Sequence, residues 1–294
     1  MTRSHQKAAS PRPARRRFGQ HFLASAWAEK VVDAIDPQPG DRFVEIGPGP
    51  GALTLLLAPR VAHLTAVELD RDLTRDLAPK LPANAEVVNA DFLDFDLTPL
   101  LDAGPLRIAG NLPYNISSPI LFKLLAAKRK RQPPLSGSNG DSRGLVDATV
   151  MLQREVADRL VARTGTKDYG VLTIFTHAQA DVERVLTLPP GAFRPAPKVH
   201  SAVVRLQFTP PRVPDDLREV FTGMVRSIFT QRRKTLGNAL RPFAESLGVS
   251  AAAALTSARI DPVRRPETLD LPEMIDLASV LKAQGQTPAP EATS

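Results

Sequence analysis

Residues 111–114, Asn-Leu-Pro-Tyr, combine groups that could hold a planar amine against an aromatic ring. The Asn111 amide oxygen and the backbone carbonyl of Leu112 or Pro113 could accept both N–H bonds of an exocyclic amine. Pro113 also fixes the turn and adds no competing N–H donor. The Tyr114 ring could stack on a base taken out of its helix, which is worth about 1–3 kcal/mol. The tetrapeptide therefore predicts a site that modifies the amino nitrogen of a nucleobase.

A glycine-rich segment upstream of this turn predicts a cofactor site. Gly47, Gly49 and Gly51 follow a short apolar run and precede a helical stretch, and glycine lets the backbone approach a ligand closely. Glu68 and Asp91 end the next two apolar runs, where carboxylates could accept from ribose hydroxyls and from an adenine amine. Both acids could instead be N-caps of the following helices. S-adenosylmethionine and NAD share an adenosine end, so these residues alone do not choose between the two cofactors.

The turn at 111–114 favours methyl transfer. The lone pair of an aromatic amine is delocalised into its ring, and two acceptors on its hydrogens would favour a more pyramidal, more nucleophilic nitrogen. A sulfonium methyl group placed in line would then react mainly because of its position. No strong general base is needed, since the methylated amine cation loses its proton readily. Phe193, in a proline-rich segment, is a candidate second stacking face for the base and, equally, a candidate core residue.

The elements that must position these residues alternate between short apolar runs and helical stretches from about residue 28 to residue 208, which is typical of a parallel α/β sheet. Parallel strands end at one edge, so Glu68, Asp91 and Asn111 are expected to meet there. Prolines within 209–214 end the alternation, and an amphipathic helical pattern follows. The expected strands are 42–46, 64–68, 85–88, 106–109, 148–152, 182–188 and 201–207.

The predicted fold is therefore α/β, with a Rossmann-like methyltransferase domain at 18–210 and a small all-helical domain at 211–283. We expect a basic tail at 1–17 and a second tail at 284–294. The segment 132–147 is rich in Pro, Gly, Ser and Asn and is predicted to be a surface loop.

The charge distribution indicates a polyanionic partner. The chain of 294 residues has a net charge of +7, and residues 1–17 contain six Lys and Arg residues and no acid. A further basic cluster is formed by Arg232, Arg233 and Lys234. Separate clusters of this kind suit phosphate contacts, so we expect these three residues to bind RNA. An Arg-rich, acid-free leader could alternatively be an organelle transit peptide.

The composition excludes several classes of protein. There is no cysteine, which excludes disulfides, thiolate metal sites and thiol nucleophiles. The five histidines show no metal-like spacing, so no metal is predicted. No apolar run approaches the roughly 18 residues that span a bilayer. We expect a cytoplasmic protein with no membrane contact that acts as a monomer.

Several motifs in a fixed order resemble those of the small-subunit ribosomal RNA adenine dimethyltransferases, the kasugamycin-sensitivity family. The resemblance runs from residue 16 to residue 282. The segments that carry it are 18–23, 44–49, 67–70, 89–91, 110–116, 151–156, 193–199 and 229–235. The position of His21 is often Asn in this family, so an imidazole would replace an amide there. The segment 132–147 is longer than is usual in the family.

The resemblance implies an enzyme that uses S-adenosylmethionine to dimethylate the N6 atoms of two adjacent adenosines. These lie in the 3′-terminal hairpin loop of small-subunit (16S) rRNA, and a role in subunit biogenesis is implied as well. The implied target-base contacts are Asn111, Leu112 and Tyr114. The implied cofactor contacts are His21, Leu23, Gly47, Gly49, Glu68, Asp91 and Asn111.

Three other functions are compatible with parts of the sequence. A large-subunit rRNA methyltransferase that confers antibiotic resistance would share the fold and the chemistry. A subunit assembly factor would use the basic clusters and need little catalysis. An NAD-dependent dehydrogenase would use the glycine loop, but it would leave the tetrapeptide at 111–114 without a role.

Overall fold

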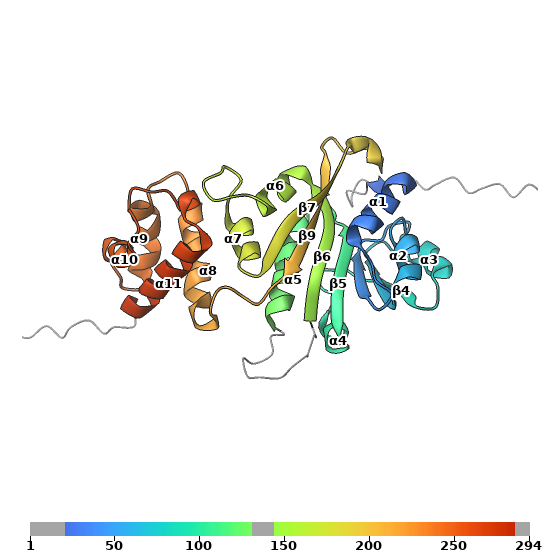
Figure 1. Ribbon diagram of the computed structural model, residues 1–294, viewed down its shortest axis with the longest axis horizontal. Coiled ribbons are helices and arrows are strands. Elements are labelled where there is room, and N and C mark those ends of the chain that lie inside the picture. Colours follow the sequence, from blue (N-terminus) through green and yellow to red (C-terminus); the bar gives the residue numbers. More distant parts are fainter. Residues whose placement is uncertain (1–20, 131–143, 286–294) are drawn as a thin grey trace, which may run out of the picture.

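The computed structural model describes residues 21–130 and 144–285 and shows an elongated molecule with a sheet at one end and a helical part at the other (Figure 1). The predicted tail at 1–17, most of the predicted loop at 132–147 and residues 286–294 lie outside the described residues. Within the described ranges, no helix has both the length and the apolar character needed to cross a membrane.

A seven-stranded sheet with the order β4-β3-β2-β5-β6-β9-β7 forms the larger part. The strands are β2 (Arg42–Ile46), β3 (His63–Glu68), β4 (Ala85–Asn89), β5 (Pro105–Asn111), β6 (Gly144–Gln153), β7 (Ala180–Leu188) and β9 (Ser201–Phe208). The first five are parallel, as expected, whereas β9 is antiparallel to both β6 and β7. The segment 189–200 joins β7 to β9 without the crossover helix that parallel neighbours require. Because β9 is antiparallel to both of its neighbours, β7 runs in the same direction as β6, and the expectation of a parallel sheet was wrong for β9 alone.

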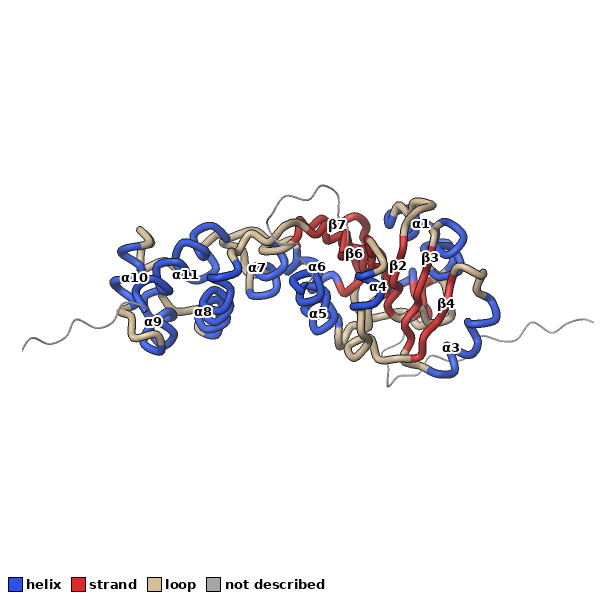
Figure 2. The backbone as a smooth tube through the Cα atoms, turned by 90° about the horizontal axis from the view of Figure 1, so that it is seen from below, coloured by secondary structure: helices blue, strands red, loops and turns tan. Residues whose placement is uncertain are grey.

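Helices cover both faces of this sheet (Figure 2). They are α1 (Ser25–Ile35), α2 (Thr54–Leu57), α3 (Arg71–Leu77), α4 (Thr98–Asp102), α5 (Ser117–Lys130), α6 (Arg154–Leu160) and α7 (Val171–His177). Val44 and Ile108 belong to a hydrophobic cluster with α4, α5 and α6, and Phe43 and Ala109 to a second cluster with α1 and α2. Successive residues of a strand point to opposite faces, so neighbours in the sequence contribute to different clusters.

The strand β6 begins at Gly144, inside the segment that was predicted to be a loop. Asp147 supports this early start, because its carboxylate is buried and binds Arg107 of β5 at 2.7 Å. The same guanidinium binds Asp41 at 2.6 Å. Asp147, which reads as a loop residue in the sequence, therefore belongs to a strand in which its charge is paired.

A short two-stranded sheet connects the N-terminal end to the segment after β7. Its strands are β1 (Phe22–Leu23) and β8 (Phe193–Arg194), which pair antiparallel. The amide of Ala24 also donates to the carbonyl of Ala192 at 2.9 Å. These contacts hold His21 close to the carboxyl ends of the central strands.

The helical part consists of α8 (Arg218–Thr230), α9 (Leu236–Ser246), α10 (Ala251–Ser257) and α11 (Leu271–Gly285). Its core contains the apolar stripe of α8, including Phe221, Met224 and Ile228, which all become buried as the spacing predicts. Tyr169 and Ile174, from the region of α7, pack into the same core. The helical part is therefore fixed to the sheet-containing part by shared apolar residues as well as by the chain connection.

Candidate active site

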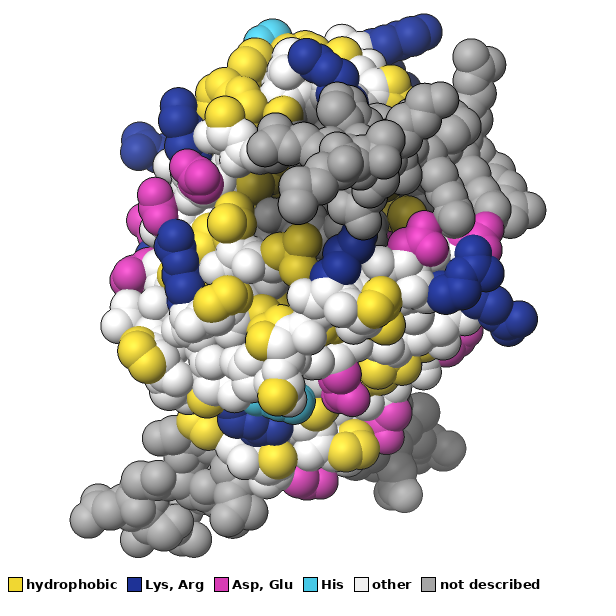
Figure 3. Space-filling view, turned by 90° about the vertical axis from the view of Figure 1, so that its right-hand side faces the viewer, with side chains coloured by type: hydrophobic (Ala, Val, Ile, Leu, Met, Phe, Trp, Pro, Cys, Tyr) yellow, Lys and Arg dark blue, Asp and Glu magenta, His cyan; other side chains and the backbone are white. Residues whose placement is uncertain are grey.

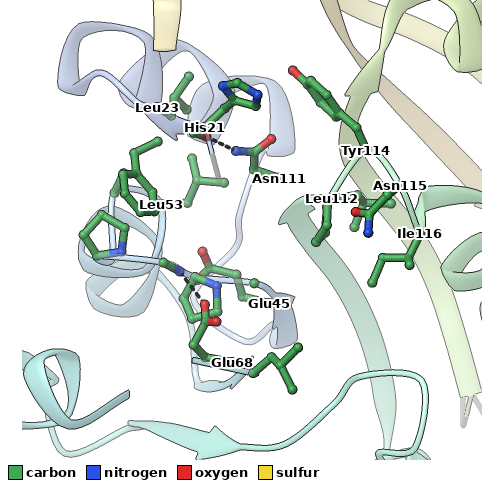
Figure 4. A pocket seen from close by; sticks show the side chains of 18 residues that line it. His21, Leu23, Glu45, Leu53, Glu68, Asn111, Leu112, Tyr114, Asn115 and Ile116 are labelled. Carbon is green, nitrogen blue, oxygen red and sulfur yellow. Dashed lines mark hydrogen bonds between the residues drawn. The ribbon is translucent and has the colours of Figure 1, made fainter. Parts of the chain in front are cut away.

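A pocket lies at the carboxyl ends of β2, β3 and β5, with a cavity volume of about 150 Å³ (Figure 4). Its walls come from the end of β1, the loop after β2, the end of β3 and the turn after β5. Lining residues include His21, Leu23, Glu45, Gly47, Gly49, Leu53, Glu68, Leu69, Asn111, Leu112, Tyr114 and Ile116. The edge predicted from the strand ends is therefore hollow, and the glycine loop and the 111–114 turn face the same space.

The glycine loop and Glu68 form one hydrogen-bonded unit. Gly47 and Gly49 have φ values of 65° and 59°, which favour glycine because a side chain would be strained there. The amide of Gly49 donates to Glu68 Oε2 at 3.0 Å, and the amide of Asp70 donates to Glu68 Oε1 at 2.8 Å. Burial raises the pKa of the Glu68 carboxyl, and these two donors oppose the shift. Asp70, not Glu68, caps α3, so the N-cap interpretation of Glu68 was wrong.

Glu45, at the end of β2, is an acid of the pocket that the sequence analysis did not select. Its side chain is buried, and Oε2 has no hydrogen-bond partner among the described residues. Burial raises the pKa of this carboxyl to about 8, and the nearby Glu68 contributes to the increase. A charged residue inside an apolar strand run was the signal in the sequence that could have identified it.

The side chain of Asn111 is oriented by the N-terminal segment. Its Nδ2 donates to the backbone carbonyl of His21 at 2.9 Å. The amide oxygen then points away from His21, toward Tyr114, as Figure 4 shows. A carbonyl-type acceptor is therefore presented to the cavity.

The turn after Asn111 leaves one backbone carbonyl better placed than the other to accept from a ligand. The carbonyl of Pro113 accepts from the amide of Ile116 at 3.1 Å. The amide of Leu112 donates to Met151 of β6 at 2.9 Å, and the Leu112 side chain is buried in the core. Of the two carbonyls that the sequence left open, the one of Leu112 is consequently the better candidate, because that of Pro113 already closes the turn.

Tyr114 is held at its edge and near one face. Its hydroxyl is 2.6 Å from the Ser201 hydroxyl. The centroids of the Tyr114 and His21 rings are 5.5 Å apart, and the angle between the two ring planes is 26°. The Nδ1 atom of His21 is 2.8 Å from the carbonyl oxygen of Pro195. Burial raises the pKa of the Tyr114 phenol. The ring predicted to stack on a base is therefore neutral at physiological pH and firmly positioned.

Comparison with known proteins adds to this geometry. A family model described as ribosomal RNA adenine dimethylase matches residues 12–282. The chain belongs to this family. A protein of Xanthomonas campestris pv. campestris (strain 8004), named ribosomal RNA small subunit methyltransferase A, is 42% identical over 282 residues, which cover 91% of this chain and 96% of that protein. Its namesake in Xanthomonas oryzae pv. oryzae (strain PXO99A) is 43% identical over 279 residues, with the same coverage.

Solved structures of related enzymes share the fold. A dimethyladenosine transferase from Plasmodium falciparum superposes with a TM-score of 0.69 at 22% identity, covering 90% of this chain and 98% of that one. The 23S rRNA methyltransferase ErmE superposes with a TM-score of 0.64 at 28% identity, covering 89% and 99%. The Rossmann-like methyltransferase fold is thus confirmed, and the chain is a ribosomal RNA methyltransferase.

Two residues predicted for the site of this dimethylase lie outside the pocket lining. Phe193 is fully buried in β8 and packs in the cluster with α1 and α2, so the structure contradicts its prediction as a second stacking face. Its apolar ring stabilises the short β1–β8 sheet. Asp91 follows β4, one strand beyond Glu68, and its carboxylate accepts from the amide of Leu93 at 2.8 Å. Its predicted contact with the cofactor adenine remains a prediction.

The predicted RNA-binding cluster lies in the turn after α8, apart from the pocket lining. Arg232 donates to the carbonyl of Lys167 at 2.9 Å and lies 3.9 Å from Glu267, whereas Arg233 and Lys234 are exposed. By contrast, Figure 3 shows the opposite end of the molecule, where basic and acidic side chains are interspersed. Among the described residues, no group of three His, Asp or Glu side chains could hold a metal ion.

Proposed function

We propose that this enzyme transfers methyl groups from S-adenosylmethionine to the N6 atoms of two adjacent adenosines in the 3′-terminal hairpin loop of small-subunit rRNA. The observation that carries the proposal is the orientation of Asn111, whose amide oxygen faces the cavity because its nitrogen donates to His21. The relatives named as small-subunit enzymes, at 42–43% identity, favour the small subunit over the large one. ErmE, a 23S rRNA enzyme, is more distant at 28%.

The walls of the pocket suit S-adenosylmethionine. Glu68 would accept from the ribose hydroxyls, and Leu53 and Leu69 would line the space beside the purine. The loop at Gly47 and Gly49 would allow the methionine portion to approach the backbone. Glu45 could accept a hydrogen bond from the ligand, since its buried carboxyl has an oxygen without a partner among the residues described. When bound, the cofactor supplies an electrophilic methyl group on a positively charged sulfur.

The residues of the turn would prepare the adenine amine. Asn111 Oδ1 and the Leu112 carbonyl would accept its two hydrogens, which holds the nitrogen lone pair toward the cofactor side of the pocket. The Tyr114 ring would stack on the extruded base. The proton of the methylated amine would then pass to solvent. Rate enhancement would come mainly from positioning, worth several powers of ten when the reacting atoms are aligned.

Contacts with rRNA would extend beyond the pocket. Arg233 and Lys234 are exposed and would meet phosphates, while Arg232 is partly engaged by Glu267. We place the enzyme in the cytoplasm, with assembling small subunits as its partner, and we expect it to act as a monomer.

The decisive test supplies labelled S-adenosylmethionine with unmodified small subunits, with large subunits and with naked rRNA, and then maps the label. We expect dimethyladenosine in the small-subunit 3′ hairpin. Label in large-subunit RNA would instead identify a resistance-type enzyme. Tight binding to small subunits without any label would indicate an assembly factor and would refute the proposed activity.

A further inference from the structure

We propose that Ser201 is a positioning residue that holds the ring of Tyr114 in the orientation that receives the target base. The inference rests on the proposed function, because it assigns the stacking role to Tyr114. The Ser201 and Tyr114 hydroxyls are 2.6 Å apart although the residues are 87 positions apart in the chain. Ser201 would not touch the substrate and would act through the phenol.

Ser201 has the rigidity that an anchor requires. It is the first residue of β9, where its backbone pairs with Gln153 of β6 on one side and with Leu188 of β7 on the other. Its side chain is fully buried. A residue flanked by strands on both sides, inside a packed sheet, has little freedom to move.

Tyr114, in contrast, follows the last paired residue of β5 and lies in a turn. Close to Tyr114, the turn is held by hydrogen bonds to main-chain carbonyls: the amide of Ile116 donates to Pro113 at 3.1 Å, and the Ser117 hydroxyl donates to Tyr114 at 3.4 Å. Neither contact restrains the side-chain torsions of Tyr114. The Ser201 hydroxyl is the group that restrains the far edge of the ring.

The restraint at the edge complements the contact near the ring face. The centroid of the His21 imidazole lies 5.5 Å from that of the Tyr114 ring, and the two rings are stacked at an interplanar angle of 26°. Contacts at the edge and near one face together define the plane of the ring, so a base stacking on Tyr114 would adopt a defined plane beside Asn111 (Figure 4). Because methyl transfer needs the amine in line with the methyl group, a tilt of the base lowers the rate even when the base still binds.

A purely structural hydrogen bond would stabilise the fold without affecting the ring's role in turnover. The two cases differ in a double-mutant cycle of Ser201→Ala and Tyr114→Phe, assayed on unmodified small subunits. We expect each single variant to lower kcat about tenfold with KM changed less than about twofold, and the double variant to match the singles. Additive losses, or a Ser201→Ala variant with wild-type kcat, would overturn the proposal.

Ser117→Ala is the matched control. Ser117 is buried beside the same turn, but its hydroxyl donates to the Tyr114 backbone and not to the ring. Its loss should leave kcat within about twofold of wild type, since it removes one ordinary hydrogen bond worth about 1 kcal/mol of stability. A tenfold loss in this control would show that turn stability, and not ring orientation, determines the rate.

A second measurement does not depend on turnover. The chain has two tyrosines, so 3-fluorotyrosine labelling gives two ¹⁹F signals, and Tyr114→Phe assigns them. Ser201→Ala should shift the Tyr114 signal and leave that of Tyr169 unchanged. An unshifted Tyr114 signal would show that the hydroxyl contact is absent in solution. A protein that shows this shift but methylates no small subunits would refute the proposed function while leaving the anchor established.

Discussion

The two walls of the active-site pocket are assembled in different ways. The cofactor wall consists of the glycine loop and Glu68, which come from consecutive strand–loop units. Glu68 receives its amide donors from Gly49 and Asp70, at most 19 positions away. The base wall consists of Asn111 and the turn that follows it, and its contacts join residues that are far apart, since Asn111 binds His21 across 90 positions and Tyr114 binds Ser201 across 87. A wall made of neighbouring segments can be read from local motifs, whereas a wall made of distant segments depends on the complete fold.

The largest expected effect comes from removing the acceptor of the base wall. Asn111→Ala should lower kcat at least about a thousandfold, because the amine loses an oriented acceptor and the reaction depends on alignment. Single-turnover transfer to small subunits measures the loss, and filter binding should show affinity within about twofold of wild type. Asn238→Ala, a surface substitution in α9, is the control. Near-normal transfer by the Asn111 variant would remove the difference in roles between the two walls.

The second effect concerns the stability of the cofactor wall. The pKa of Glu45 is about 8 in the folded protein, so this carboxyl keeps a proton that the unfolded chain loses above pH 4.5. The contribution of Glu45 to stability should therefore fall as the pH rises from about 4.5 to about 8, by an upper limit of about 5 kcal/mol.

Glu45→Gln removes this titration. Denaturant unfolding should show the variant more stable than wild type at pH 9 and nearly equal at pH 4. Equal stabilities at both values would mean that the carboxyl is solvated or paired in solution.

The third expected effect is on the affinity of the glycine loop and Glu68 for the cofactor. Glu68→Gln keeps the shape of the side chain but replaces one carboxylate oxygen with an NH₂ group, which is a donor and would face the N–H of Gly49 or Asp70. The side chain would then be a poorer acceptor for the cofactor ribose. Loss of a charge-assisted hydrogen bond costs about 1.5–3 kcal/mol, so the cofactor Kd should rise about 10- to 100-fold. Calorimetry with S-adenosylmethionine measures this change. Because the base wall is assembled separately, binding of small subunits without cofactor should be unaffected, and a parallel loss of both affinities would contradict the separation.

The smallest effect lies outside both walls. Arg233→Ala with Lys234→Ala should weaken small-subunit binding and lower the salt slope by about one for each lost phosphate contact. Arg232→Ala alone should do less, because Glu267 and the carbonyl of Lys167 already engage its guanidinium. Binding measured across a salt series gives the slopes. An unchanged slope would place the RNA surface elsewhere.

Much of the fold could be predicted because its signals are periodic. Alternating apolar runs identified the strands, and the spacing of Phe221, Met224 and Ile228 identified the buried face of α8. The errors had physical causes. Asp147 reads as a loop residue until Arg107 pairs with it in the neighbouring strand. The antiparallel β9 follows from its partners in the sheet, which no local pattern specifies.

The residues of the candidate site fall into the same two groups, those that local patterns reveal and those that depend on tertiary contacts. Gly47, Gly49, Glu68 and Asn111 were found from their types and their positions at strand ends, and the structure places all of them around one pocket. Phe193 was misassigned because an aromatic residue beside prolines has the same sequence signature whether it packs in a core or faces a ligand. Ser201 was missed because a serine in a strand gives no signal until its partner is known.

The sequence by itself determined the class of sheet, the chemistry of the cofactor loop and the groups of the 111–114 turn, because these depend on spacing along the chain. Only the tertiary structure decided which way the Asn111 amide points, what holds the Tyr114 ring and that Glu45 is buried without a full set of partners. Each of these depends on contacts between segments about ninety positions apart or on desolvation by the whole core, and both arise only when the chain has folded.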